Sequence, residues 1–113
     1  MLKVPMLFWN LTKEFLDKLY IEQSIMGKGK ELLQSILEAY SDEPLLKADG
    51  FDDAVIGVSD NFSKPRLVYS VKRCIKILVE GGMTDEEAME HFYNNVSGSY
   101  VGEQTPVWCE DNF

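Results

Sequence analysis

Glu87 and His91 stand four residues apart in a predicted helix, a spacing that can place both side chains on one metal ion. A metal site would need a second pair of ligands, and only Cys109 or distant acidic residues could supply them. His91 is the chain's single histidine, and such a residue is more often an ordinary polar residue of a helix surface. We therefore predict no bound metal and no cofactor.

Asp49, Asp52 and Asp53 cluster just before a predicted strand. Their spacing does not match a calcium-binding loop, which needs alternating oxygen ligands, a central glycine and a distal glutamate. Together with Glu103 they could form a carboxylate group for an ion or an acid–base pair. We favour the simpler interpretation, a solvated loop rich in turns. A small metal- or nucleotide-binding protein or enzyme that uses these four carboxylates is the first alternative function.

Cys74 could act as a nucleophile with His91 as its base, since that chemistry needs only proximity in space. Its position in a predicted helix directs it to the core, where a thiol stays protonated and behaves as a small apolar group. We therefore predict no catalytic residue. Cys74 and Cys109 do not make a disulfide framework, and a bridge between them is the less favoured alternative.

Acidic charge is concentrated in the C-terminal third of the chain. The net charge is −8, and residues 80–113 contain eight acidic residues without a single lysine or arginine. Carboxylates arrayed along a helix can occupy a basic groove built for nucleic acid. Tryptophan is frequent at binding hot spots, although it also serves as a packing anchor. The predicted partner-binding residues are Glu80, Asp85, Glu86, Glu87, Glu90, Glu103, Trp108, Glu110 and Asp111.

The same charge limits the classes of partner. A surface of net charge −8 repels DNA and anionic membranes, so we expect neither as a direct partner. The partner that we expect is a protein with a basic surface. Lys72, Arg73 and Lys76 form a basic group on the outer face of another predicted helix. They are either a solvated face, paired with the acidic helix, or half of a self-complementary homodimer contact.

Length and composition indicate one globular domain. The chain has 113 residues, 45% of them hydrophobic, with thirteen aromatic residues, which is enough for a core. The apolar stretch at the N-terminus is too short for a secretion signal and lacks a small-residue cleavage site. No segment reaches the apolar length needed to cross a bilayer. We therefore expect a soluble protein of the cytoplasm.

The elements that must position these residues follow an α-α-β-β-α-α order, an α+β fold. An N-terminal helical hairpin is predicted in residues 1–48, with helices over 10–26 and 31–40 joined by a polar turn at 28–30. Two β-type runs at 54–58 and 66–69 are joined by a loop and predict an antiparallel ribbon. Gly57 within the first run indicates a bulge or a close approach by another backbone.

Two further helices complete the part from 49 to 113. Ser70 is suited to cap one helix, which ends at the glycines 81 and 82. Thr84 and Glu87 form a capping box for the next helix, predicted over 85–95. Three acidic residues in its first turn suit the helix dipole. A short extended piece is predicted over 97–102, and residues 105–108 are interpreted as a chain end held by an aromatic anchor.

Four segments carry a family resemblance, in order along the chain: Gly50–Gly57, Cys74–Leu78, Gly82–Ala88 and Tyr100–Pro106. Over roughly residues 49–108 the sequence resembles small acidic proteins of unassigned role that are encoded by bacteriophages and prophages. The resemblance implies a viral or prophage source and a role in host takeover or in blocking a host defence. It carries no catalytic assignment, and the N-terminal helical pair is interpreted as an added interaction element.

The leading hypothesis combines this resemblance with the charge. It is a non-enzymatic phage protein that binds and inhibits a host protein, such as a CRISPR defence complex, in the host cytoplasm. The acidic C-terminal region would contact a basic surface of the target. A second alternative is a small component of the virion or its scaffold.

Overall fold

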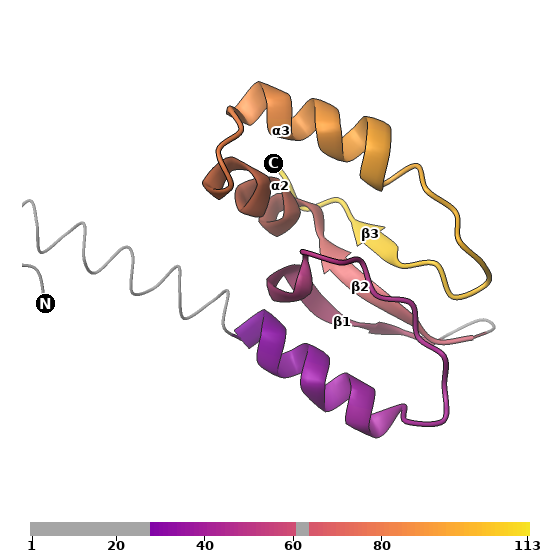
Figure 1. Ribbon diagram of the computed structural model, residues 1–113. Coiled ribbons are helices and arrows are strands. Elements are labelled where there is room, and N and C mark those ends of the chain that lie inside the picture. The colour runs from indigo at the N-terminus through magenta and orange to yellow at the C-terminus, as the bar shows by residue number, and fades with distance from the viewer. Residues whose placement is uncertain (1–27, 61–63) are drawn as a thin grey trace, which may run out of the picture.

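The computed structural model describes residues 28–60 and 64–113 (Figure 1). A helix occupies residues 28–39. It is followed by the 3-10 turn η2 (Asp52–Ala54), β1 (Val55–Ser59), β2 (Arg66–Ser70), α2 (Val71–Glu80), α3 (Asp85–His91), the π-helical turn η3 (Phe92–Val96) and β3 (Val107–Cys109). The fold is mixed α+β, as the sequence predicts. The first predicted helix, over 10–26, lies outside the described residues.

The three strands form one sheet in the order β1-β2-β3. β1 and β2 are antiparallel, and the register shifts between Val55 and Gly57, where a bulge was predicted. β3 is parallel to β2, with Tyr69 opposite Trp108. This third strand was not predicted. The extended piece was expected at 97–102, but those residues form a turn and an irregular loop, so that prediction is wrong.

The sheet lies between its helices. Figure 1 shows helix 28–39 on the side of β1, and α3 on the side of β3. Leu67 and Tyr69, which alternate along β2, are completely buried. One core cluster joins the layers: Leu33, Ile36, Phe51, Ala54, Val55, Leu67, Tyr69, Val71, Cys74, Ile75, Ala88 and Phe92. Within residues 28–60 and 64–113, no helix has the length and apolar character to cross a membrane.

The predicted helix starts are confirmed at both caps. The Ser70 hydroxyl accepts a hydrogen bond from the Arg73 amide at 3.1 Å, which caps α2. At α3 the Thr84 hydroxyl accepts from the Glu87 amide, and the Glu87 carboxylate accepts from the Thr84 amide. Local patterns fix these boundaries because each cap joins residues only three apart.

Helix 28–39 begins earlier than the sequence suggested. The polar turn predicted at 28–30 is wrong, because these residues are helical. Gly29 is buried, and a methyl group on its Cα would overlap the backbone carbonyl of Asp53. Glycine therefore serves here to let the helix approach η2 closely, not to make a turn.

Replacing Gly29 with alanine tests this contact. In an open helical position, Gly→Ala stabilises a protein. Here we expect Gly29→Ala to lower the free energy of unfolding by about 1–3 kcal/mol, because the neighbouring atoms are backbone and cannot rotate away. Urea denaturation measures the change. Gly57→Ala is the control, since nothing lies within 4 Å of its added methyl. If Gly29→Ala lowered the free energy of unfolding no more than Gly57→Ala does, or raised it, the close contact between helix 28–39 and η2 would be contradicted.

Candidate functional site

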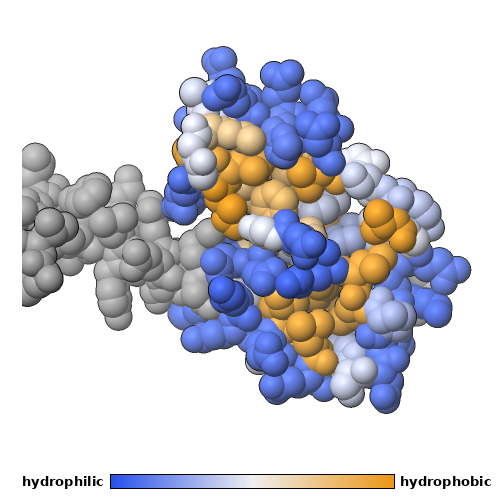
Figure 2. Space-filling view, in the orientation of Figure 1, coloured by the Kyte–Doolittle hydropathy of each residue, from blue (hydrophilic) through white to orange (hydrophobic). Residues whose placement is uncertain are grey.

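The outer face of α3 presents carboxylates to solvent. Asp85, Glu86 and Glu90 are exposed, and within the part of the chain that the structure describes they have no hydrogen-bond or ion-pair partner. Glu87 differs, because its carboxylate is held by the Thr84 amide at 2.9 Å, and this hydrogen bond lowers the pKa of Glu87. Glu87 is exposed and charged as well, but its carboxylate already has a donor, whereas Asp85, Glu86 and Glu90 have none among the described residues. Figure 2 shows this hydrophilic outer surface above an apolar band.

Two large apolar side chains share this face with the acids. Met89 and Tyr93 are 42% and 40% exposed. Met89 lies three residues after Glu86 in α3, and Tyr93 lies seven residues after it, in η3, which continues α3 without a break. The Tyr93 hydroxyl donates to the Glu110 carboxylate at 2.7 Å, which also raises the pKa of the Tyr93 phenol. Tyr93 is thus exposed but fixed in orientation.

Met89 and Tyr93 were not among the predicted partner-binding residues. The signal that could have found them is their spacing, because residues three and four apart on a helix are neighbours on its surface. The structure places Val96 against the core and leaves Met89 exposed.

Asp111, predicted to bind a partner, is used within the fold. Its carboxylate accepts from the Ser70 hydroxyl at 2.6 Å and from the Lys72 amide at 2.8 Å. Burial alone would raise the pKa of Asp111, but these two hydrogen bonds and the nearby charge of Arg73 together lower it. The C-terminal segment is therefore fastened to the first turn of α2. We call Ser70, Asp111 and the Lys72 amide the α2 clasp.

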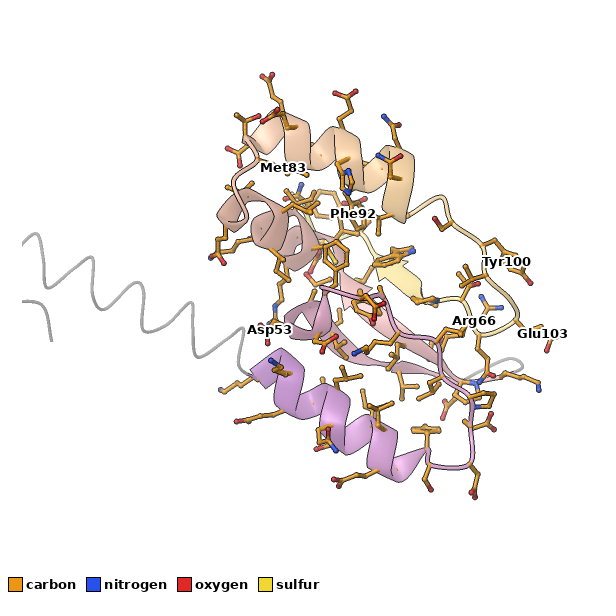
Figure 3. The ribbon with its side chains drawn as sticks, in the orientation of Figure 1. Asp53, Arg66, Met83, Phe92, Tyr100 and Glu103 are labelled. Carbon is orange, nitrogen blue, oxygen red and sulfur yellow. The ribbon has the colours of Figure 1, made fainter. Side chains whose placement is uncertain are left out.

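Trp108 also packs inside the molecule. Its ring lies 5.1 Å from that of Tyr69 and 5.3 Å from that of Phe92, measured between ring centroids. The contact with Phe92 is edge-to-face, an arrangement that aromatic quadrupoles favour. Figure 3 shows Phe92 pointing from the helix toward the sheet. Trp108 thus holds the end of the chain, as an aromatic anchor would.

The four carboxylates of the first alternative function do not come together. Figure 3 shows Asp53 beside the start of helix 28–39 and Glu103 in the loop at the other end of the molecule. Lys47 forms an ion pair with Asp52, with Nζ and Oδ1 3.5 Å apart. Among residues 28–60 and 64–113, no group of three or more His, Cys, Asp and Glu side chains is placed to hold a metal ion. The shared carboxylate site is therefore not formed.

In the two other candidate pairs, Glu87 with His91 and Cys74 with His91, the side chains contact other residues. The Glu87 carboxylate faces Thr84, while the His91 ring lies 3.3 Å from the Asn95 amide nitrogen. Cys74 is completely buried, and burial raises the pKa of its thiol to about 12. A thiol with that pKa is protonated at neutral pH and a poor nucleophile. Cys74 and Cys109 are both free thiols.

Two of the three basic residues of α2, Lys72 and Arg73, lie at the clasp. Lys72 is exposed, and its backbone amide binds Asp111, while the positive charge of Arg73 acts on the same carboxylate. Part of this basic group therefore balances an acid inside the chain. A homodimer contact through it stays a prediction.

Asp111→Asn tests the clasp. The variant keeps the side-chain shape but loses the charge that accepts two hydrogen bonds at a helix N-terminus, so we expect a loss of about 1–2 kcal/mol in unfolding free energy at neutral pH. The pKa of Asp111 is lowered in the folded state, so its contribution is full above the usual carboxyl value of 3.8 and is lost as pH falls through the lower folded value. Urea unfolding at several pH values measures this.

The control for that experiment is Glu103→Gln, at an exposed carboxylate without a hydrogen-bond partner in the described part of the chain. It should leave stability unchanged within about 0.5 kcal/mol at every pH. A loss at Asp111 that is equally large at pH 2 and pH 7 would show that the carboxylate charge is not what holds the clasp.

Comparisons with protein family models, with curated protein sequences and with solved structures found no match. The resemblance over residues 49–108 therefore stays a prediction, and the functional argument depends on the geometry of the described residues.

Proposed function

We propose that this protein is a non-enzymatic binding protein whose α3 face docks on a basic surface of a partner protein. The observation that carries the proposal is one helix stripe on which exposed carboxylates, Glu86 and Glu90, alternate with exposed apolar groups, Met89 and Tyr93. We call these four residues the α3 stripe, of which the first three lie in α3 and Tyr93 lies in η3, directly after it. Protein interfaces combine apolar contact area with surrounding charged and polar groups, and the α3 stripe presents both.

The carboxylates supply attraction and selectivity. They have no partner within the described residues, so no intramolecular ion pair has to break when a partner's lysine or arginine approaches. Attraction between such surfaces accelerates encounter and weakens as salt rises. The acids also repel nucleic acid and anionic membranes, which favours a protein partner.

The apolar residues supply contact area. Tyr93 is held by Glu110, so little side-chain freedom is lost when a partner covers it. Met89 is flexible and adapts to the shape of the surface it meets. The Trp108–Phe92 contact holds the inner side of the same helix, so the α3 stripe is presented on a fixed element.

The class of partner comes from the resemblance noted in the sequence. Small acidic phage and prophage proteins imply a host protein as the target, and inhibition as the effect. A basic groove that normally receives nucleic acid, as in a CRISPR defence complex, is the surface chemistry that the α3 stripe complements. Binding there would block access of nucleic acid to the groove.

Neutralising the two carboxylates tests the proposal. The wild-type chain is immobilised, exposed to a bacterial lysate, and the proteins released by salt are identified and purified. We expect the double variant Glu86→Gln, Glu90→Gln to bind the purified partner at least about tenfold more weakly, equal to about 1.4 kcal/mol. The wild-type affinity should fall as ionic strength rises from about 0.05 to 0.5 M.

The matched control is Glu31→Gln with Asp49→Asn, which removes the same charge from exposed positions away from α3. It should keep the wild-type affinity within about twofold. If both double variants lost the same affinity for the partner, the effect would come from the net charge of the protein and not from the position of the two carboxylates on α3. A partner that binds tightly and without salt dependence would contradict docking through the carboxylates.

A further inference from the structure

The α3 stripe is too small to hold a partner protein alone. It consists of four side chains, and its two apolar members, Met89 and Tyr93, are each less than half exposed. A standard stable interface buries roughly 800 Å² on each partner, contributed by about 20–30 residues. A partner that docks on α3 must therefore also cover surface next to it.

The segment that leaves η3 is tied to the layer that carries the α3 stripe. The amide and the hydroxyl of Ser97 donate to the carbonyls of Phe92 and Tyr93, at 2.9 and 3.4 Å. The Ser99 hydroxyl donates to the Asn95 carbonyl at 3.2 Å. Figure 1 shows the chain continuing from the end of this layer through a loop to β3. The start of that loop therefore has a fixed position relative to the stripe.

The loop of residues 100–105 exposes its apolar side chains. Tyr100 and Val101 are 73% and 62% exposed, more than any other large apolar side chain of the described residues except the last, Phe113. Figure 3 shows Tyr100 in this loop, directed away from the sheet. A contiguous exposed apolar patch, unlike a single exposed residue, is typical of a contact surface.

The polar side chains of the same loop face inward. Gln104 is 5% exposed, and its amide donates to the Pro65 carbonyl at 3.0 Å. The Thr105 hydroxyl accepts from the Val101 amide at 2.9 Å and donates to the Gly102 carbonyl at 2.7 Å. Gly102 has a φ of +136°, which L side chains rarely adopt. The loop is thus fixed in a conformation that uses its hydrogen bonds inside and presents its apolar pair outside.

A fixed loop of this kind suits binding to a pocket. Little conformational entropy is lost when a partner covers it, because the backbone is already ordered. Two apolar side chains on one loop fall far short of the roughly 800 Å² per partner of a stable dimer, so a second copy docked on the loop alone would not be held. A convex turn with one aromatic and one aliphatic side chain instead fits a concave apolar pocket of another protein.

The loop also continues the charge of the α3 stripe. Glu103, one of the predicted partner-binding residues, lies in this loop and is exposed. A partner whose basic surface meets the carboxylates of α3 therefore meets another carboxylate beside Tyr100 and Val101. Stripe and loop share one combination, carboxylates next to exposed apolar groups.

We propose that the loop of residues 100–105 is the second part of the docking surface, with Tyr100 and Val101 filling an apolar pocket beside the basic surface of the partner protein. This proposal rests on docking through the α3 stripe and adds most of its apolar contact. The carboxylates of α3 attract and orient the partner, whereas Tyr100 and Val101 slow its release.

Affinity measurements on variants of the full chain test the proposal. The probe is the protein that salt releases from the immobilised wild-type chain, after purification. We expect Tyr100→Ser with Val101→Ser to weaken its binding at least about tenfold, mainly through faster dissociation. The salt dependence of the affinity should match that of the wild type, because no charge is removed. Both side chains are exposed, so the variant should fold, and thermal unfolding checks this.

Two further variants serve as controls. Leu37→Gln removes a 38% exposed apolar side chain from helix 28–39, on the side of β1, and should keep the wild-type affinity within about twofold. Tyr100→Phe keeps the aromatic ring and should do the same. A loss in Tyr100→Phe as large as in the double variant would assign the contact to the hydroxyl and overturn the apolar pocket.

The failure of this inference can be told from the failure of docking through α3. If Glu86→Gln with Glu90→Gln weakens binding and Tyr100→Ser with Val101→Ser does not, the α3 stripe stands and the loop contact is overturned. If only the loop variant weakens binding, the loop contact stands and the α3 stripe fails. A wild-type dimer that the loop variant converts to a monomer in light scattering would place a second copy on the loop and overturn the inference.

Discussion

The first turn of α2 is fastened by two side chains from distant parts of the sequence, Ser70 and Asp111. Ser70 ends β2 and caps the helix, and its hydroxyl donates to Asp111 at 2.6 Å while the Lys72 amide donates to the same carboxylate. Helix N-termini favour negative charge, so the clasp suits the dipole of α2. The parallel pairing of β3 with β2 places Cys109 opposite Ser70, and this brings Asp111, two residues later, to the start of α2.

The position of α3 follows from that strand. Trp108, fixed in β3, contacts Tyr69 of the sheet and Phe92 of the helical layer, so it joins the two. Glu110, two residues later, orients Tyr93 on the outside of the same layer. The acidic residues near the C-terminus thus divide into two groups. Some hold the fold together, and those on the outer face of α3 are free to meet a partner.

Interactions between residues close in the chain could be predicted from the sequence. The Ser70 cap, the capping box of α3 and the β1–β2 hairpin each join neighbours, so the residue types reveal them. β3 could not be predicted, since a parallel partner lies far away in sequence and leaves no turn signal. A glycine that allows contact looks the same as one that makes a turn, which is why Gly29 was misinterpreted. Asp111 looked like surface charge because its hydrogen-bond donors are on β2 and α2.

Hydrogen–deuterium exchange of the chain, alone and bound to its captured partner, tests docking through α3 most directly. The account predicts that slowing of exchange on binding is largest over residues 85–96, while β1 exchanges at the same rate in both states. Protection centred on β1 or on helix 28–39, with none over 85–96, would contradict it and place the partner elsewhere on the surface.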